Sequence, residues 1–153
     1  MVRIGLLNVE EHGTREIEMR SIRLLDEDGR ESATFRSGGA MTVEIDYAAQ
    51  RRIERPVFGF NIKTGNGFYV FGSNTQIARV PIDAVEGNGR IRLRIEPLTL
   101  KQGRFFLSLA VHSWDHAVQY HRQEDLHPFL VKDASGDKGV FQLNCNWEHR
   151  VSP

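Results

Sequence analysis

The stretch that decides the fold is GRFFLSLAVH, residues 103–112. From Phe105 on, every second side chain is apolar and large, at Phe105, Leu107, Leu109 and Val111. Such period-two alternation is typical of a β-strand that buries one face and turns the other outward. Two further stretches alternate in the same way, MTVEIDY at residues 41–47 and RIRLRI at residues 90–95. The pattern therefore predicts an all-β protein.

Working outward, weaker strand patterns occur at residues 17–25, 33–35, 57–62, 68–71, 129–131 and 140–143. Turn-forming glycine, asparagine and aspartate residues separate them, at 28–29, 38–39, 65–67, 87–89 and 136. Eight or nine short strands with such turns predict an antiparallel β-sandwich. Residues 81–85 alone indicate a helical turn.

The length of 153 residues suits one domain with a real core. We expect residues 15–153 to form it and residues 1–14 to be a linker or a first edge strand. The polar run DASGDKG at residues 133–139 predicts a flexible connection to the last strand. Such a connection serves either an ordinary hairpin or a hinge through which two copies exchange strands.

Composition excludes several functions. Lysine plus arginine equals aspartate plus glutamate at 20 each, so the net charge is zero, which argues against a nucleic-acid binder. No apolar run reaches 18 residues and the first residues lack signal-peptide features, so we expect a cytoplasmic protein. Cys145 is the only cysteine and cannot form an internal disulfide. The motifs GxxxxGK[ST], GxSxG and CxxC are absent, and we expect neither an enzyme nor a cofactor.

The two outer sheet faces differ in character. One carries Glu44 and Asp46 on one strand and Arg90, Arg92 and Arg94 on another. Antiparallel pairing of these strands places opposite charges side by side, at about 0.2–1 kcal/mol per pair. A solvated, internally neutralised face is the expected result.

The other outer face carries small side chains. Ser108 and Ala110 on one strand and Gly59 and Asn61 on another predict a shallow, uncharged trough. Sugars bind such surfaces by stacking on aromatic rings and by hydrogen bonding to amides and imidazoles. Each aromatic side chain here also fits a place in the core. The predicted carbohydrate-binding residues are Asn61, Tyr69, Asn74, Ser108, His112, Trp114, Gln119 and Tyr120.

Six histidines raise the question of a metal site. His112 and His116 are four residues apart, roughly 13 Å along a strand, and share one metal only if Trp114 and Asp115 form a turn. Structural zinc usually needs four well-spaced ligands, so we expect no metal. A glycosidase pair of carboxylates stays open, but the sequence singles none out.

Several segments together show a resemblance. They are FRSGG at residues 35–39 before the alternating residues 41–47, RPVFGF at 55–60, FGSNT at 71–75, LTL at 98–100 leading to GRFFLSLAV at 103–111, and GVF at 139–141 with Trp147. Their order and spacing, over residues 15–147, resemble the carbohydrate-binding C-terminal domain of Wzt-type proteins. These are the nucleotide-binding subunits of O-antigen polysaccharide ABC transporters.

The resemblance implies an immunoglobulin-like β-sandwich that binds the terminally modified end of the O-polysaccharide at the inner face of the inner membrane. It also implies a homodimer that exchanges the C-terminal strand, and an ATPase domain that precedes this one and contacts the membrane subunit. The site residues given above are inferred from the residues and are not transferred from the family. The alternative is a structural dimerisation module that orients the ATPase without binding a glycan.

Overall fold

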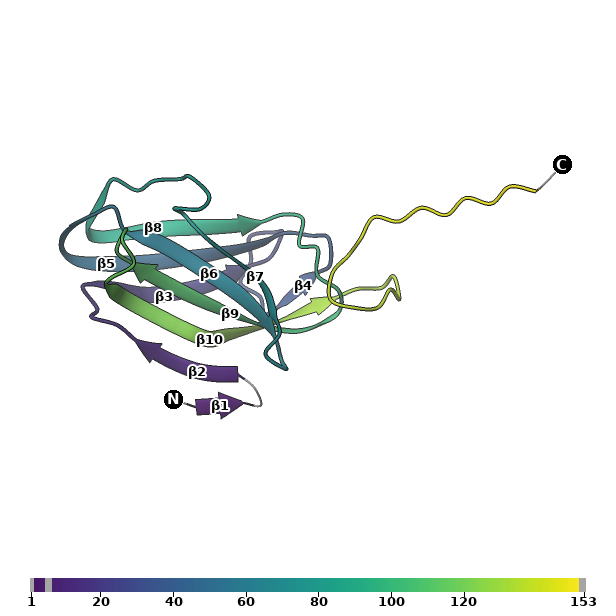
Figure 1. The fold of residues 1–153 in the computed structure, drawn as a ribbon, viewed down its shortest axis with the longest axis horizontal. Coiled ribbons are helices and arrows are strands. Elements are labelled where there is room, and N and C mark those ends of the chain that lie inside the picture. The colour runs from purple at the N-terminus through teal and green to yellow at the C-terminus, as the bar shows by residue number, and fades with distance from the viewer. Residues whose placement is uncertain (1, 5–6, 152–153) are drawn as a thin grey trace.

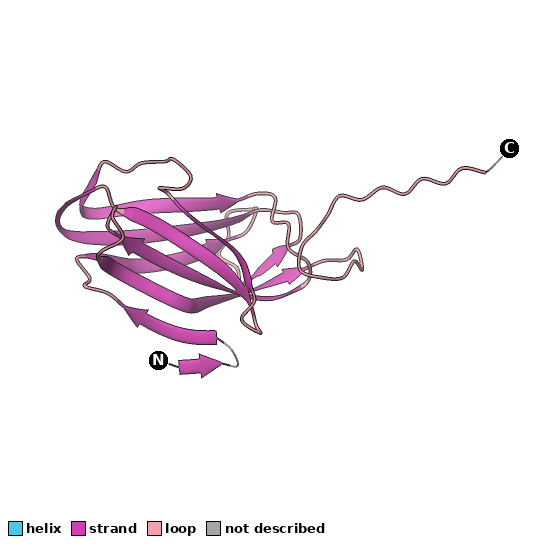
Figure 2. Ribbon diagram, in the orientation of Figure 1, coloured by secondary structure: helices cyan, strands magenta, loops and turns pink. Residues whose placement is uncertain are grey.

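The computed structural model describes residues 2–4 and 7–151, and every regular element in this part of the chain is a β-strand (Figure 2). No membrane-crossing helix occurs among these residues. The ten strands are β1 (Val2–Ile4), β2 (Leu7–His12), β3 (Ile17–Leu25), β4 (Thr34–Arg36), β5 (Met41–Glu54), β6 (Val57–Thr64), β7 (Tyr69–Asn74), β8 (Ala84–Ile95), β9 (Gly103–His112) and β10 (Gln119–Lys132).

The strands form two sheets that pack face to face (Figure 1). The larger sheet has the order β1-β2-β10-β9-β6-β7, and the smaller sheet has the order β3-β5-β8. The predicted all-β sandwich is confirmed. It is antiparallel apart from one pair, because the short β4 runs parallel to β10.

The core lies between the sheets and follows the predicted alternation. Phe105, Leu107, Leu109 and Val111 of β9 point inward and pack with Val43 of β5 and its inward neighbours. Each fully buried side chain of this size contributes about 1.5–3 kcal/mol relative to an exposed one. The side chains that alternate with these four, among them Ser108 and Ala110, therefore lie on the outer face of the larger sheet.

The smaller sheet has the charged outer face that the sequence predicts. Arg92 lies opposite Glu44 and Arg90 opposite Asp46. Glu44 is only 1% exposed, because Arg23, Arg90 and Arg92 all contact its carboxylate. The carboxylates of this outer face are therefore neutralised by a shared network of arginines.

Two parts of the chain differ from the prediction. The predictions of a helical turn at residues 81–85 and of a turn at residues 87–89 are wrong. Strand β8 begins at Ala84 and continues through Gly87 and Gly89, because it pairs along the length of β5. Residues 119–128 belong to β10, which the sequence analysis did not predict beyond residues 129–131. Two register shifts against β9 interrupt the alternation of β10, so its period is hidden.

The N-terminal residues join the larger sheet as strand β2, which pairs with β10. Leu7 is fully buried. Gly13 then has a φ of 135°, and a Cβ there would lie 2.4 Å from the backbone oxygen of Tyr120. Only glycine lets the chain pass this close to β10.

The C-terminal residues leave the body of the sandwich (Figure 1). The predicted strand at residues 140–143 is reduced to one bridge between Leu100 and Phe141. We call residues 141–151 the C-terminal arm. Beyond the bridge the arm runs outward with no strand partner among the described residues, and Trp147 is 99% exposed.

Candidate functional site

A shallow trough of about 210 Å³ lies on the outer face of the larger sheet, over β6, β7 and β9. The register brings small side chains together, because Gly59 lies opposite Ala110 and Asn61 opposite Ser108. Gly72 of β7 lies opposite Asn61 on the other side. The sequence analysis expected a trough at this position.

Five of the predicted residues line this trough, namely Asn61, Tyr69, Asn74, Ser108 and His112. They come from β6, β7 and β9, three neighbouring strands of the larger sheet. The remaining lining residues are Gly59, Phe60, Gly72, Ser73, Ile77, Leu109, Ala110 and Arg122.

Ser108 forms part of the floor. Its side chain is 2% exposed, its hydroxyl donates to Asp125 Oδ1 at 3.0 Å, and it accepts the Asp125 backbone N–H at 2.7 Å. Asp125 also accepts from the backbone N–H of Asn8 at 3.2 Å. The Ser108 hydroxyl is therefore already hydrogen-bonded within the protein, and these bonds link β9 to β10.

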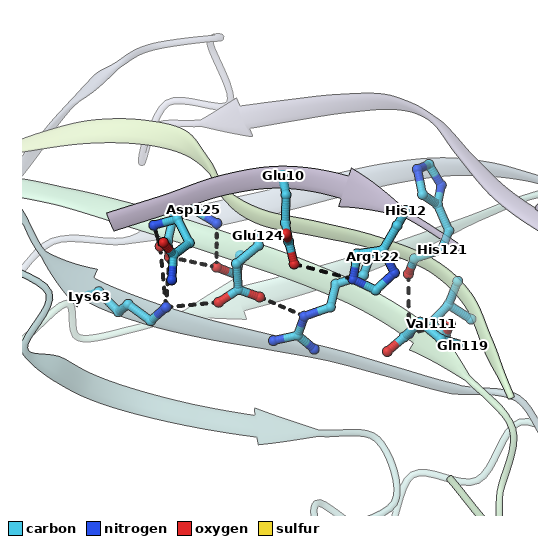
Figure 3. A network of polar contacts seen from close by, with 11 residues as sticks. Glu10, His12, Lys63, Val111, Gln119, His121, Arg122, Glu124 and Asp125 are labelled. Atoms are coloured by element: carbon cyan, nitrogen blue, oxygen red, sulfur yellow. Dashed lines mark hydrogen bonds and ion pairs between the residues drawn. The ribbon is translucent and has the colours of Figure 1, made fainter. Parts of the chain in front are cut away.

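A charged network continues from this floor along β10 (Figure 3). Lys63 Nζ contacts Glu124 Oε1 at 2.8 Å and Asp125 Oδ1 at 3.1 Å. The other oxygen of Glu124 accepts from Arg122 Nε at 2.6 Å. The positive charges of Lys63 and Arg122 thus balance the negative charges of Glu124 and Asp125 beside the trough.

The pKa directions agree with this pairing. Burial alone would raise the pKa of Glu124, but the hydrogen bonds from Lys63 and Arg122 outweigh it and the pKa is lowered. Burial alone would lower the pKa of Lys63, and its hydrogen bonds to Glu124 and Asp125 raise it instead. Glu124 and Lys63 are therefore held in their charged forms at neutral pH.

Asn61 differs from its neighbours. Its side chain is buried, and among the described residues its Oδ1 has no hydrogen-bond partner. The Tyr69 side chain lies beside it, since a Cβ at Gly72 would be 2.0 Å from the Tyr69 hydroxyl and 3.3 Å from Asn61 Cβ. Tyr69 itself is more than half exposed, on the edge strand.

His112 adds an imidazole at the end of the trough. Its Nδ1 is 2.7 Å from the carbonyl oxygen of Ser113 and donates to it, which leaves Nε2 as an acceptor. Burial, and to a smaller extent the charges of His116 and Arg122, lowers the pKa of His112. At neutral pH the ring is therefore an uncharged polar group.

Comparison with known proteins identifies the family. The family model described as the Wzt C-terminal domain matches residues 8–143, most of the chain. This chain belongs to the Wzt C-terminal domain family. No curated protein matches it significantly.

A solved structure agrees with this assignment. The structure described as the C-terminal domain of Wzt shares the fold at a TM-score of 0.81 and 14% identity, covering 93% of this chain and 89% of the solved chain. Membership of the Wzt C-terminal domain family associates the domain with an ABC transporter for O-antigen and with a non-catalytic binding role.

Three of the predicted carbohydrate-binding residues lie away from the trough of this Wzt C-terminal domain. Tyr120 is 6% exposed and packs in the core between the sheets, because the register shift in β10 turns it inward. Gln119 donates through its amide to the carbonyl of Val111 at 3.0 Å. The guanidinium of Arg55 covers the Trp114 ring at 3.9 Å from the ring centre. These three residues therefore do not line the trough, and their role in carbohydrate binding stays a prediction.

Arg122 lines the trough and was missed by the sequence analysis. It lies on β10 opposite Ala110, in the segment whose alternation the register shifts interrupt. The stretch QYHRQEDLH, residues 119–127, shows no period-two alternation, so the sequence held no strand signal that could have placed Arg122 at the trough.

The histidines hold no metal site among the described residues. The turn at Trp114 and Asp115 does form, and it brings the rings of His112 and His116 to 4.3 Å between centres. Their nitrogens are engaged elsewhere: His112 Nδ1 with the Ser113 carbonyl, and His116 Nε2 with Gln76 Oε1 at 2.7 Å.

An apolar cleft of about 430 Å³ opens between the two sheets, where the edge strands β7 and β8 do not meet. Aromatic and aliphatic side chains line it, among them Tyr47, Phe58, Phe60, Ile91 and Leu93. The cleft therefore exposes part of the inner surface of the sandwich next to a free strand edge.

Lys101 holds both the segment before the C-terminal arm and the first residues of the arm to the body of the domain. This side chain is 1% exposed, and its Nζ donates to Ser135 Oγ at 2.9 Å and to Gln142 Oε1 at 2.6 Å. It also pairs with Asp133. The arm beyond alternates apolar and polar residues, and Leu143 and Trp147 are exposed.

Proposed function

We propose that this domain binds a saccharide in the trough and serves as the recognition module of an ABC exporter for O-antigen polysaccharide. The observation that carries this proposal is the polar lining of the trough, in which the one charged side chain among the described residues, Arg122, is paired with Glu124. Among the described residues, those that line it include no carboxylate, and Asn61, Asn74 and His112 offer polar groups beside the Tyr69 ring. Sugars bind through this combination of stacking and hydrogen bonds.

The size of the trough favours the end of a glycan. At about 210 Å³ it is smaller than the roughly 300–1,000 Å³ of enclosed small-molecule sites. We propose that it takes the terminal, modified non-reducing end of the O-polysaccharide. One such shallow contact gives an affinity of about micromolar or weaker.

The rest of the assembly follows from the family. We propose that the domain lies at the cytoplasmic, inner face of the inner membrane, attached to an ATPase domain and through it to the membrane subunit. Its partners are then the polysaccharide and the transporter, and neither a cofactor nor nucleic acid takes part.

Titration calorimetry with purified O-polysaccharide tests the binding function. The wild-type domain is expected to bind, and Tyr69→Ala to bind at least tenfold more weakly with a melting temperature within about 3 °C of wild type, because the ring is more than half exposed. Trp114→Ala is the matched aromatic control and keeps wild-type affinity. Absence of binding by the folded wild-type domain contradicts the proposal.

We also propose a homodimer in which the C-terminal strands are exchanged. The arm alternates apolar Phe141, Leu143, Cys145 and Trp147 with polar residues, as a half-buried strand does. All four side chains are exposed, and Trp147 almost completely. The apolar cleft beside the free edge of β8 offers such a strand both backbone partners and an apolar surface.

The arm and cleft also support a second candidate function, a dimerisation module that orients the attached ATPase without binding a glycan. Light scattering and calorimetry together separate the two. A dimer that binds no O-polysaccharide favours the dimerisation module, whereas a dimer that binds it in the trough favours saccharide recognition.

A further inference from the structure

The side-chain amide of Asn61 is the feature of the trough that folding does not explain. The residue is 7% exposed, and its Oδ1 has no hydrogen-bond partner among the described residues. A buried polar group without a partner costs folding free energy.

The neighbouring polar groups are already engaged. Ser108 exchanges hydrogen bonds with Asp125, and Asn74 Oδ1 accepts the backbone N–H of Ile77 at 2.7 Å. These side chains shape the trough but have less free hydrogen-bonding capacity. Asn61 is thus the lining amide whose buried acceptor is left without a partner among the described residues.

We propose, on the basis of the saccharide-binding function above, that Asn61 is the specificity-determining residue of the trough and binds two adjacent hydroxyl groups of one sugar residue. A primary amide presents one acceptor and one donor side by side. Two adjacent hydroxyls that are gauche to each other match it, because one donates to Oδ1 while the other accepts from Nδ2.

Other groups fit this amide less well. A carboxylate only accepts and leaves Oδ1 without a donor. An acetamido group is a trans secondary amide whose N–H and C=O point in opposite directions, so it satisfies only one half of Asn61 at a time. The ligand class is therefore a sugar with a free vicinal diol.

The ligand reaches Asn61 past Tyr69. In the unliganded structure the Tyr69 side chain lies over Gly72 and beside Asn61. It stands on an edge strand and is 57% exposed, so rotating this one side chain opens the amide without disturbing the sheet. The displaced ring is then free to stack on the face of the sugar.

The test compares Asn61→Leu with the matched control Asn88→Leu, which changes an exposed asparagine on β8 of the opposite sheet. Leucine fills the same space and removes the unpaired amide. We expect Asn61→Leu to bind the O-polysaccharide of the source strain about ten- to a hundredfold more weakly, with a melting temperature equal to or above that of wild type. Unchanged affinity, or a melting temperature several degrees lower, overturns the proposal.

A second measurement uses the wild-type domain alone. Mild periodate cleaves vicinal diols, so the oxidised and borohydride-reduced polysaccharide is expected to bind at least tenfold more weakly than polysaccharide treated with borohydride only. Equal binding of the two preparations overturns the role of the diol while leaving saccharide binding intact. Failure of the untreated polysaccharide to bind overturns the proposed function, and this inference with it.

Discussion

Replacing Lys63 by methionine tests the charged network beside the trough. Lys63 is 19% exposed in its side chain and lies against the carboxylates of Glu124, 13% exposed, and Asp125, 0% exposed. Removing one partner of a buried ion pair costs about 3–5 kcal/mol, because the other charge stays buried. Methionine has a similar side-chain length, so the loss in the free energy of unfolding reports the removal of the charge.

The expected loss lies at the lower end of this range, about 3 kcal/mol at pH 7.5. Glu124 still accepts from Arg122, and Asp125 still accepts from the Ser108 hydroxyl and the Asn8 N–H. Both carboxylates therefore keep a hydrogen bond when the cation is gone.

The stability lost in Lys63→Met is expected to be smaller at low pH. The lowered pKa of Glu124 gives wild type a stabilisation that is full above the ordinary glutamate value of about 4.3 and is lost as pH falls through the folded-state pKa. Without Lys63, Glu124 loses one of the two hydrogen bonds that lower its pKa, so its pKa is higher in the variant than in wild type. Protonation of Glu124 on acidification then removes part of the cost of the buried charge in the variant. The difference between wild type and variant therefore shrinks from pH 7.5 to pH 4.

Urea unfolding followed by circular dichroism, at one fixed protein concentration, measures both effects. Lys132→Met is the control, since Lys132 is an exposed lysine on β10 and forms no ion pair among the described residues. A loss below about 1 kcal/mol for Lys63→Met at pH 7.5, or a loss that is the same at pH 4, refutes the reasoning.

Three further predictions concern the rest of the fold. Burial, the largest cause in each case, lowers the pKa of His112, His121 and His127, so the free energy of unfolding should decline as pH falls below the ordinary histidine value of about 6.5; a flat profile between pH 7.5 and 5 in urea titrations contradicts this. Gly13→Ala should destabilise the domain by at least about 2 kcal/mol and speed hydrogen exchange in β2, since its Cβ meets backbone atoms at 2.4 Å; wild-type exchange rates argue against it. Ending the chain after residue 142 should give a monomer by light scattering, and a persisting dimer would rule out the C-terminal arm as the exchanged element.

The sandwich was predictable because the alternation in its central strands is regular. In β9, Phe105 and Leu107 point inward while Ser108 points outward, so the pattern gives both the strand and its faces. The same regularity predicted that opposite charges would face each other across residues 41–47 and 90–95, as Glu44 and Arg92 do. Strands of this kind need only local sequence to be assigned.

The rest was decided by tertiary pairing. In β10 the register shifts turn Tyr120 into the core and bring Arg122 to the trough, and no local pattern marks where a strand shifts register. Trp114 is covered by Arg55, a residue 59 positions earlier in the chain. Neighbours that are distant in the sequence also decide which polar side-chain atoms are left without a hydrogen-bond partner, as Asn61 Oδ1 is among the described residues.

The most direct test of the central claim, that the trough of the larger sheet binds saccharide, is a titration of the 15N-labelled domain with O-polysaccharide oligosaccharides, followed by NMR. The account predicts that the largest shifts fall on the side-chain amides of Asn61 and Asn74 and on the backbone of β6, β7 and β9 around them. Shifts confined to the apolar cleft or to the charged face of the smaller sheet, or no shifts at all, contradict it.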